Sequence, residues 1–495
     1  MFQKLFFKKD PLKFPDEPPQ QVKRILFLGD WIMTEEYDLV IIGTGAAGVS
    51  AATTAVHLGA FHIAVVERGP LWGTCVNTGC IPSKFLLTLA GYNYYRGRDH
   101  PGISVEGQLD LKQVLAEKNA LQEKLKEKKR DNLFSKLGVE LIEGEAHFLS
   151  PHMLQVNNRK LTSKRFIIAT GSSPLIPSIE GIESVLFQTN TEALSPDHIP
   201  ATLIVIGGRA LGLEFAQLYA HLGTKVTLLQ RSARILPEED PEIADLMAGY
   251  FAQEGIDILT GVEITRAERS GNFVAVSVSI GKEQRVITAE KLLLATGRSP
   301  NTRELNLGVA GVNIRKDGVV IVDTTLKTSA PHIWAAGDVT GEPMLETAAR
   351  YGGEIAASNA LRELKRSFNH FFLPHGIFTT PQVASLGLTE EGAQRAGLQP
   401  ISHSIRLSSM AKFSIDGDTR GIVKIVADRE NRRILGVHIC APLATEMIQE
   451  GVIAVMWYLT VDDLAQMPHI FPTATEALAV CAHGLIDNTD DVRER

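Results

Sequence analysis

The chain has 495 residues, 44% hydrophobic and 22% charged, a globular composition that excludes disorder, collagen and coiled coil as the main architecture. Fifty Lys and Arg against 57 Asp and Glu residues give a net charge of −7, which speaks against a nucleic-acid-binding protein because such domains are usually basic. No apolar stretch reaches about 18 residues, so no membrane span is expected. At roughly 100–200 residues per domain, we expect three or four domains.

The first 33 residues carry scattered lysines and four prolines, without the apolar core and cleavage site of a signal peptide. We expect 1–33 to be a disordered extension, and Met33 resembles a natural start. The four cysteines of the chain are too few for the disulfide framework of a secreted protein. We therefore expect a cytoplasmic protein.

Two stretches repeat one pattern: a strand, a glycine-rich turn, a helix and a second strand. The first has an apolar strand over 37–42, a helix of small residues to about residue 58 and a strand over 62–67. The second has a strand over 203–207, a helix to about residue 222 and a strand over 225–229. Apolar strands that alternate with helices are typical of a parallel sheet covered on both faces, so the repeat predicts an α/β chain with two dinucleotide sites.

The remaining segments divide into two kinds. The charged segment 109–137 is helical in composition, and strands are expected over 166–171 (FIIATG) and 292–297 (LLLATG), which are near copies. From about residue 371 the pattern changes. Strands over 421–426 and 434–439 are followed there by helices over 445–459 and 476–486, which predicts a separate α+β domain.

The first glycine-rich turn has the spacing of a dinucleotide site. Gly43 permits the tight turn, Gly45 lets the backbone approach a pyrophosphate, and Gly48 lets helix and strand pack closely. The helix that follows offers unpaired N–H groups to phosphates. Glu67 ends the next strand, where an acid accepts hydrogen bonds from ribose hydroxyls.

Cys75 and Cys80 lie close together in the segment CVNTGCIPSK. Gly79 and Pro82 allow a bend that could bring the two sulfurs together. A close pair in an intracellular protein serves redox or metal chemistry more often than structure, and a metal site usually needs two more ligands, which the nearby chain lacks. Lys84 would share a helix face with Cys80 and favour its thiolate. The pattern predicts a redox-active pair, with an inert buried pair as the alternative.

The segment Gly73-Thr-Cys-Val-Asn-Thr-Gly-Cys-Ile-Pro-Ser-Lys84 resembles the active-site signature of the flavoprotein disulfide reductases, which include dihydrolipoamide dehydrogenase, glutathione reductase and mercuric reductase. The resemblance covers essentially all of residues 34–487, and Trp72 departs from the usual glycine before the signature. It implies an α/β fold with two Rossmann-like domains, for FAD and NAD(P)H, and a C-terminal α+β dimerisation domain. We expect an N-terminal extension (1–33), a FAD-binding domain in two parts (34–199 and 291–366), an NAD(P)H-binding domain (200–290) and a dimerisation domain (367–495).

The resemblance also assigns roles. Cys80 would be the thiolate against the flavin, Cys75 the thiol that exchanges with substrate, and Lys84 would pair with Glu214 near the flavin. Ala335-Ala-Gly-Asp338 resembles the family's second FAD motif. The resemblance implies FAD contacts at Gly43, Gly45, Gly48, Glu67 and Asp338, and cofactor binding also at Thr74, Lys84, Thr170, Gly171, Gly297 and Gly337.

The second glycine-rich turn, with Gly207 and Gly212, lies where the family binds its nicotinamide cofactor. Arg209 stands at the middle glycine of the fingerprint, which opposes close backbone approach, although a guanidinium can itself contact phosphate.

The strand after this turn ends at Gln230, where an acid would hold the 2′-hydroxyl of NADH, and Arg231 and Arg234 follow. Arginines pair with a 2′-phosphate and an acid repels it. We therefore predict NADPH rather than NADH; the alternative is that the arginines lie in a solvated turn.

In thiol–disulfide members of the family, the last domain carries His-x-His-Pro-Thr-x-x-Glu, whose second histidine is the acid/base. Here the segment is His469-Ile-Phe471-Pro-Thr473-Ala-Thr-Glu476, and Phe471 cannot transfer a proton. His469 faces the same side of an extended chain at roughly 6–7 Å distance, so the sequence leaves open whether it takes over. Thr473 and Glu476 would act on the active site of the partner subunit.

The missing histidine favours the mercuric reductase branch, because soft Hg(II) prefers thiolates and its reduction needs electrons rather than a proton relay. We expect a homodimeric FAD- and NADPH-dependent reductase whose Cys75 and Cys80 transiently hold Hg(II) or a similar acceptor, with no nucleic-acid or membrane partner. Two alternatives remain: a reductase of small disulfides that uses His469, and a flavin redox sensor with little turnover. Cys440 and Cys481 are expected to be buried cysteines, with a metal relay as the alternative.

Overall fold

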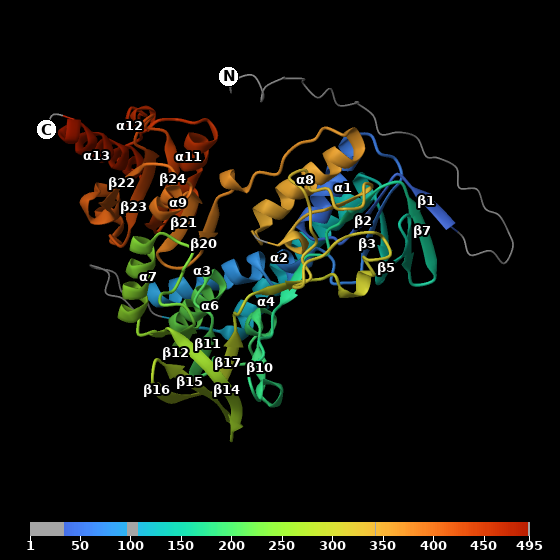
Figure 1. Cartoon of the computed structure of the whole chain (residues 1–495). Coiled ribbons are helices and arrows are strands. Elements are labelled where there is room, and N and C mark those ends of the chain that lie inside the picture. The colour runs from blue at the N-terminus through green and yellow to red at the C-terminus, as the bar shows by residue number, and fades with distance from the viewer. Residues whose placement is uncertain (1–33, 97–106, 342, 494–495) are drawn as a thin grey trace.

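The computed structural model describes residues 34–96, 107–341 and 343–493, so the extension expected over 1–33 lies outside the described residues. Figure 1 shows three bodies around two central helices, α3 (Cys80–Arg96) and α6 (Ala210–His221). We call them the first nucleotide domain (built on sheet β19-β8-β2-β3-β4), the second nucleotide domain (sheet β10-β17-β11-β12-β13) and the C-terminal domain (sheet β20-β21-β24-β23-β22). Among the described residues, no helix has both the length and the apolar character needed to cross a bilayer.

The first nucleotide domain has a parallel five-stranded sheet. Every residue of β2 is buried, as its apolar run predicts. Helices α1 and α8 pack closely because Gly353 has no Cβ, which would lie 2.2 Å from the carbonyl oxygen of Ala47. The strands are β2 (Leu39–Ile42), β3 (Ile63–Glu67), β4 (Glu140–Glu143), β8 (Phe166–Ile168) and β19 (Ile333–Ala335), and the helices are α1 (Ala46–His57), α2 (Gly73–Asn77), α3, α4 (Leu111–Arg130) and α8 (Glu346–Arg362).

The strand predicted over 37–42 divides at Asp38. Tyr37 pairs with Ser163 in a small sheet of order β1-β7-β6-β5, whereas Leu39 pairs with Ile63 in the central sheet. The helix predicted over 109–137 also divides, because α4 ends at Arg130 and a π-helical turn follows over Asp131–Lys136. The strands of the small sheet are β1 (Thr34–Tyr37), β5 (Ala146–Ser150), β6 (Met153–Val156) and β7 (Arg159–Ser163).

The second nucleotide domain repeats the parallel sheet and adds an antiparallel sheet β14-β15-β16. Its strands are β10 (Phe187–Gln188), β11 (Thr202–Ile206), β12 (Lys225–Gln230), β13 (Asp257–Thr260), β14 (Val262–Ser270), β15 (Phe273–Ile280), β16 (Glu283–Ala289) and β17 (Lys291–Leu294), and its helices are α5 (Asn190–Ala193), α6 and α7 (Pro241–Gln253).

The two near-copy segments of the sequence meet in space. Strands β8 and β17 end at Ile168 and Leu294, earlier than predicted, because the chain turns at Gly171 and Gly297, both with positive φ. The segments that follow, β9 (Ser172–Pro174) and β18 (Arg298–Pro300), then pair antiparallel. This two-stranded ribbon joins the two nucleotide domains.

The C-terminal domain has an antiparallel sheet. Its helix α11 ends at Met456, short of the predicted residue 459, and Tyr458 follows with φ 56°. The strands are β20 (His375–Ile377), β21 (Gln382–Gly387), β22 (Pro400–Arg406), β23 (Ile422–Asp428) and β24 (Ile434–Ala441), and the helices are α9 (Glu390–Arg395), α10 (Ala411–Asp416), α11 (Ala444–Met456), α12 (Val461–Ala465) and α13 (Glu476–Arg493). Short 3₁₀ turns of the chain occupy Ile182–Ser184, Arg303–Leu305, Asp338–Thr340, His370–Phe372 and Leu407–Ser409.

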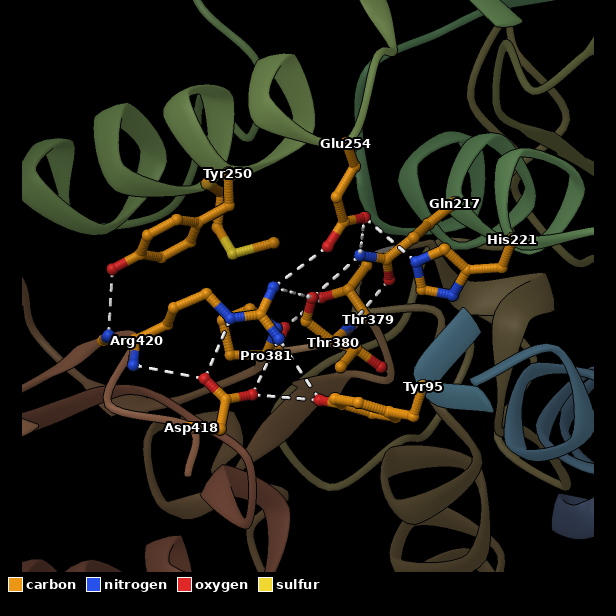
Figure 2. Close-up of polar contacts among 12 residues, drawn as sticks. Tyr95, Gln217, His221, Tyr250, Glu254, Thr379, Thr380, Pro381, Asp418 and Arg420 are labelled. Carbon is orange, nitrogen blue, oxygen red and sulfur yellow. Dashed lines mark hydrogen bonds and ion pairs between the residues drawn. The ribbon is translucent and has the colours of Figure 1, made fainter. Parts of the chain in front are cut away.

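The three bodies meet at a buried polar junction, which Figure 2 shows. Glu254, after α7, accepts a hydrogen bond from His221 at 3.0 Å and pairs with Arg420 at 2.9 Å. Arg420 also pairs with Asp418, which accepts from Tyr95 of α3 at 2.9 Å. Burial alone would raise the pKa of Glu254, but the hydrogen bonds it accepts and the charge of Arg420 lower it. The helix that begins at Cys80 is thus fixed to both other domains.

Candidate functional site

The first glycine turn has the shape that a bound phosphate needs. A Cβ at Gly43, whose φ is +113°, would lie 2.3 Å from the carbonyl oxygen of Ala169, and a Cβ at Gly48 would lie 1.9 Å from that of Gly43. In front of Gly45, which precedes α1, there is open space, and no side chain caps this helix. The first N–H groups of α1 are thus left for a ligand such as a pyrophosphate.

Glu67 holds this turn from the end of β3. Its Oε2 accepts hydrogen bonds from the backbone nitrogen of Thr44 at 2.9 Å and from Thr44 Oγ1 at 2.7 Å. Thr44 Oγ1 in turn accepts from the backbone nitrogen of Trp72 at 2.8 Å. A carboxylate has about four acceptor positions, so Glu67 retains capacity for a ribose hydroxyl while it connects the glycine turn to the cysteine segment.

Trp72 adopts a backbone conformation that glycine adopts more easily than other residues. Its φ is 78°, in the left-handed region that is costly for a bulky residue. The side chain is buried and packs against Phe134, with ring centroids 5.6 Å apart. The packing of the indole compensates for the backbone strain at the start of the signature.

Asp338 lies beside two residues that sequence reasoning missed. Ser172 Oγ donates to Asp338 Oδ2 at 2.6 Å, and Arg298 Nε donates to Ser172 Oγ at 2.6 Å. Arg298, largely buried, also donates to Thr74 Oγ1 at 3.2 Å. Arg298 thus joins the predicted second FAD motif to α2, and its position directly after Gly297 is the signal that could have indicated it.

The other predicted residues of this region lie along the ribbon β9–β18. Thr170 Oγ1 donates to the carbonyl oxygen of Asn301 at 2.8 Å, and Gly297 accepts from the backbone nitrogen of Leu175 at 2.9 Å. Gly171 and Gly337 both have positive φ, and a Cβ at Gly337 would lie 3.1 Å from the Cβ of Ala47. The structure therefore gathers both predicted FAD motifs around the start of α1.

The cysteine pair lies where α2 gives way to α3. Both thiols are free and half-buried. The interaction with the Cys75 thiol and the charge of Lys84 lower the pKa of Cys80 to about 7, while the interaction with Cys80 and burial raise the pKa of Cys75. The pair loses its first proton near neutral pH, and the negative charge then resides on Cys80.

Polar side chains from distant segments hold the backbone where α2 passes into α3. Gln122 of α4 donates to the carbonyl oxygens of Val76 and Asn77 at 2.7 and 2.9 Å. Asn190 of α5 donates to the carbonyl oxygen of Thr78 at 2.6 Å. Sequence reasoning missed both residues, because nothing in their local pattern shows a contact with a segment so far away in the chain.

Lys84 lies one turn after Cys80 on α3 and contacts Glu214 of α6. The distances from Lys84 Nζ to the two carboxylate oxygens are 2.8 and 2.9 Å. Glu214 is buried and also accepts from the backbone nitrogen of Phe378 at 2.9 Å, while Lys84 Nζ lies 4.6 Å from the Phe378 ring centroid. The ion pair with Glu214 positions the ammonium group of Lys84, whose charge acts on Cys80.

The second glycine turn has the same close approach as the first. A Cβ at Gly212 would lie 1.7 Å from the carbonyl oxygen of Gly207. Arg209 directly precedes α6, and its side chain is exposed and forms an ion pair with Glu238. In this structure the partner of the Arg209 guanidinium is therefore a carboxylate.

Gln230 lies at the end of β12 with its side chain turned inward. Its Oε1 accepts from the backbone nitrogen of Gly208 at 2.8 Å, and its Nε2 donates to Ser232 Oγ. Arg231 is exposed and Arg234 is half-buried. Arg231 and Arg234 thus both lie in the segment that follows β12.

The C-terminal segment has a different arrangement from the acid/base pair of thiol–disulfide enzymes. Phe471 is 70% exposed, whereas the side chain of His469 is 9% exposed. His469 Nε2 lies 3.0 Å from Glu450 Oε2, and its Nδ1 lies 2.9 Å from the carbonyl oxygen of Met467. Glu476 begins α13, which lies at the outer edge of the C-terminal domain, away from the central α2, in Figure 1. Within one chain, the segment 469–476 therefore does not approach Cys75 and Cys80.

Cys440 and Cys481 are fully buried. Cys440 Sγ lies 3.6 Å from Met247 Sδ, and Cys481 donates to the carbonyl oxygen of His403 at 3.2 Å. Burial raises the pKa of each thiol to about 12. Across the described ranges, no group of three or more His, Cys, Asp or Glu side chains could hold a metal ion.

Two regions of the chain match known families. Residues 37–353 match the pyridine nucleotide-disulphide oxidoreductase family, and residues 373–481 match its dimerisation domain. The chain belongs to the pyridine nucleotide-disulphide oxidoreductases. The predicted fold class is confirmed, with two Rossmann-like nucleotide domains and a C-terminal α+β domain, and the dimerisation domain supports a homodimer.

Three relatives narrow the assignment within these oxidoreductases. A mercuric reductase of Lysinibacillus sphaericus is 39% identical over 454 residues, 91% of this chain and 83% of the relative. A dihydrolipoyl dehydrogenase of Thermus scotoductus is 36% identical over 457 residues, 91% and 97% of the two chains. Among solved structures, the HOCl-induced flavoprotein disulfide reductase RclA from Escherichia coli aligns with a TM-score of 0.82 and 30% identity, covering 90% of this chain and 99% of that one.

These comparisons confirm the enzyme class and the cofactor class. The chain is a FAD-dependent NAD(P)H oxidoreductase of the type that acts on a metal ion or a sulfur group, and it is mercuric reductase-like at moderate identity. Both glycine turns fit these groups, because each leaves a helix N-terminus without a side-chain cap.

Proposed function

We propose that this oxidoreductase uses NADPH to keep Cys75 and Cys80 reduced, and that the pair then reduces Hg(II) or a similar thiophilic acceptor. Bound FAD would supply the path by which electrons from NADPH reach the cysteines. The observation that carries the proposal is the combination of a thiol–thiolate pair beside Lys84 with Phe471, which cannot transfer a proton, at the acid/base position. The similarity to mercuric reductases supports it.

The cysteines perform the proposed chemistry in two stages. Cys80 is already deprotonated near neutral pH, so binding of Hg(II) by both sulfurs requires the loss of one further proton, from Cys75. Two electrons then pass from the two thiolates to Hg(II), which leaves as Hg(0), and an S–S bond forms between Cys75 and Cys80. No group has to protonate a departing thiolate in this reaction, so Phe471 does not prevent it.

The remaining predicted residues take positioning and binding roles in this proposal. The first turn and Glu67, Thr74, Thr170 and Asp338 would hold FAD, and Arg231 with Arg234 would meet the 2′-phosphate of NADPH. The predicted domain boundaries are part of the same proposal. We place the enzyme in the cytoplasm, where NADPH is available to the cysteines.

The partner subunit would complete the site. Phe471 and Ile470 are 70% and 81% exposed, and Trp457 and Tyr458 of the same domain are also exposed. Large apolar side chains gathered on one domain are typical of a protein–protein interface. In the proposed homodimer, Thr473 and Glu476 act at the cysteines of the partner.

The test is anaerobic NADPH consumption by the FAD-loaded enzyme with Hg(II) and excess small thiol, scored by the release of volatile Hg(0). We expect sustained turnover that disappears in Cys80→Ser and persists in Cys481→Ser, a matched change at a buried thiol. Flavin reduction without Hg(0) release would contradict the proposed acceptor and leave the cofactor assignment in place.

A second candidate, reduction of a small organic disulfide, is favoured by the contact of 3.0 Å between His469 and Glu450. A histidine paired with a carboxylate is the usual form of an acid/base. If this candidate holds, His469→Ala abolishes disulfide turnover and removes a neutral limb from the pH–rate profile. Hg(0) release would not depend on His469.

A further inference from the structure

The ion pair between Arg209 and Glu238 lies directly at the second glycine turn. Arg209 is the residue before α6, and both side chains of the pair are more than half exposed, 63% and 51%. Exposed ion pairs contribute little free energy because water competes for both partners. A ligand phosphate arriving at the start of α6 can therefore replace Glu238 as the partner of Arg209.

Glu238 itself is held in place by its backbone neighbours. The backbone nitrogen of Leu236 donates to the carbonyl oxygen of Gly208 at 2.8 Å, and that of Glu239 donates to the carbonyl oxygen of Leu236 at 3.0 Å. The buried carboxylate of Glu239 accepts from Ser385 Oγ at 2.6 Å and lies 2.6 Å from His375 Nε2. Glu238 thus lies between the glycine turn and a residue anchored in the C-terminal domain.

The contacts that anchor the segment of Glu238 extend across all five strands of the C-terminal sheet. One residue from each of its five strands forms a row of cross-strand neighbours: His375, Ser385, His438, Lys424 and Ser404. Lys424 Nζ lies 3.0 Å from Asp240 Oδ2, and Ser404 Oγ donates to Glu242 Oε1 at 3.0 Å. The segment that carries Glu238 is therefore attached to a rigid sheet at several points, and its backbone cannot easily withdraw when a ligand binds.

We propose that Glu238 restrains Arg209 and thereby weakens the affinity of the enzyme for the pyrophosphate of its pyridine nucleotide. The carboxylate acts in two ways: it occupies the guanidinium that would otherwise bind phosphate, and its own negative charge repels the ligand. The inference rests on the proposed function in placing the pyridine nucleotide at this turn. It adds Glu238, which no sequence motif indicated, as an affinity-determining residue.

The pyrophosphate is common to NADH and NADPH, whereas the 2′-phosphate is assigned to Arg231 and Arg234. Glu238→Gln should therefore change the affinity for both nucleotides by the same factor. This separates the role of Glu238 from the choice between the two cofactors.

The test is calorimetric titration of the FAD-loaded enzyme with ADP-ribose, 2′-phospho-ADP-ribose and 2′-AMP at fixed ionic strength. In Glu238→Gln we expect the dissociation constants of the first two ligands to fall about three- to tenfold, and that of 2′-AMP, which has no pyrophosphate, to stay within about twofold of the wild-type value. Arg209→Gln should raise the first two constants. Glu283→Gln is the matched control, because it removes a carboxylate paired with Arg285 on β16 of the same domain.

Three results would overturn the inference: an unchanged or raised dissociation constant for ADP-ribose in Glu238→Gln, an effect confined to the ligands that carry a 2′-phosphate, or an equal gain in Glu283→Gln. Equal affinity of the wild-type enzyme for ADP-ribose and 2′-phospho-ADP-ribose would instead contradict the proposed NADPH preference. In that case the ADP-ribose titration of Glu238→Gln still decides the role of Glu238.

Discussion

Gln230 and Gly208 are joined by a hydrogen bond of 2.8 Å from the backbone nitrogen of Gly208 to the amide oxygen Oε1 of Gln230. Glu67 makes the equivalent contact in the first nucleotide domain, where its Oε2 accepts from the backbone nitrogen of Thr44 at 2.9 Å. In each nucleotide domain, the residue that ends the strand after the first helix supports the glycine turn. This residue is Glu67 at the end of β3 and Gln230 at the end of β12. This role requires an acceptor but no charge, so an amide can replace the acid at the second site without loss of the turn.

Gln230→Glu should therefore keep the turn and reverse the proposed preference for NADPH. The new carboxylate can still accept from Gly208, while its charge repels a 2′-phosphate and favours a 2′-hydroxyl. We expect the ratio of kcat/KM for NADPH to kcat/KM for NADH to fall by about tenfold or more, as for the loss of one charge-assisted interaction. Steady-state kinetics with the two cofactors measures this ratio.

Gln284→Glu, an identical change at an exposed position of β16, is the control for the added charge. If Gln230→Glu and Gln284→Glu lower the ratio equally, the effect comes from net charge rather than from contact with the ribose. If Gln230→Glu leaves the ratio unchanged, Gln230 does not face the 2′-position.

The second prediction concerns the ionisation of the cysteine pair. The interaction with the Cys75 thiol and the charge of Lys84 lower the pKa of Cys80 to about 7, so alkylation of the reduced enzyme by iodoacetamide should rise through pH 7. In Lys84→Gln the midpoint should move to higher pH, because one stabilising charge is lost. Mass spectrometry of the alkylated peptide reports the rate at each pH, and Lys126→Gln on α4 serves as the control. A wild-type midpoint at the ordinary thiol value of about 8.5 would contradict the assignment.

The parts of the site that could be predicted from sequence are those that lie within one local segment. Gly43 and Gly48 show their roles by spacing alone, because a tight turn with close packing excludes a Cβ. The contact between Lys84 and Glu214 joins residues 130 positions apart, and only the family resemblance indicated it.

The contacts that sequence analysis missed share one physical cause. Arg298, Gln122 and Glu238 all act through side chains that reach a distant segment, and their own neighbours in sequence carry no periodic or compositional signal for that reach. Strand ends were also misplaced at the near-copy segments, because the positive φ of Gly171 and Gly297 turns the chain before the apolar pattern ends.

The third prediction tests the backbone strain at Trp72. Its φ of 78° costs roughly 1 kcal/mol or more for a residue with a Cβ, whereas loss of the buried indole costs about 3–5 kcal/mol. Trp72→Gly and Trp72→Ala should both be less stable than the wild type. Unlike at most positions, the glycine variant should be the more stable of the two, by about 2 °C or more in the thermal midpoint at equal FAD loading. A more stable alanine variant would show that residue 72 does not adopt this conformation.

The fourth prediction concerns the three-domain junction of Figure 2. Arg420→Gln leaves the buried carboxylates of Glu254 and Asp418 without their cation, and the expected loss of stability is about 3 kcal/mol. Because the pKa of Glu254 is lowered in the folded state, its contribution is present above its unfolded pKa and lost as the pH falls through its folded pKa. The destabilisation should therefore shrink as the pH falls below about 4. Thermal unfolding across pH measures it, with the exposed Arg285→Gln as a control that should not change; a pH-independent loss would show that packing, rather than charge, accounts for it.

The last prediction concerns the two cysteines outside the redox pair. Burial raises the pKa of Cys440 and Cys481 to about 12, so both remain protonated at neutral pH, and a thiol is a poor metal ligand compared with a thiolate. Their surroundings are a methionine sulfur and backbone carbonyls, which offer no route for a metal to the active site. The double variant C440S/C481S should therefore keep its turnover with Hg(II) at equal FAD loading, although buried hydroxyls lower its thermal midpoint. Loss of turnover without loss of FAD or of the folded dimer would show that these cysteines relay the metal.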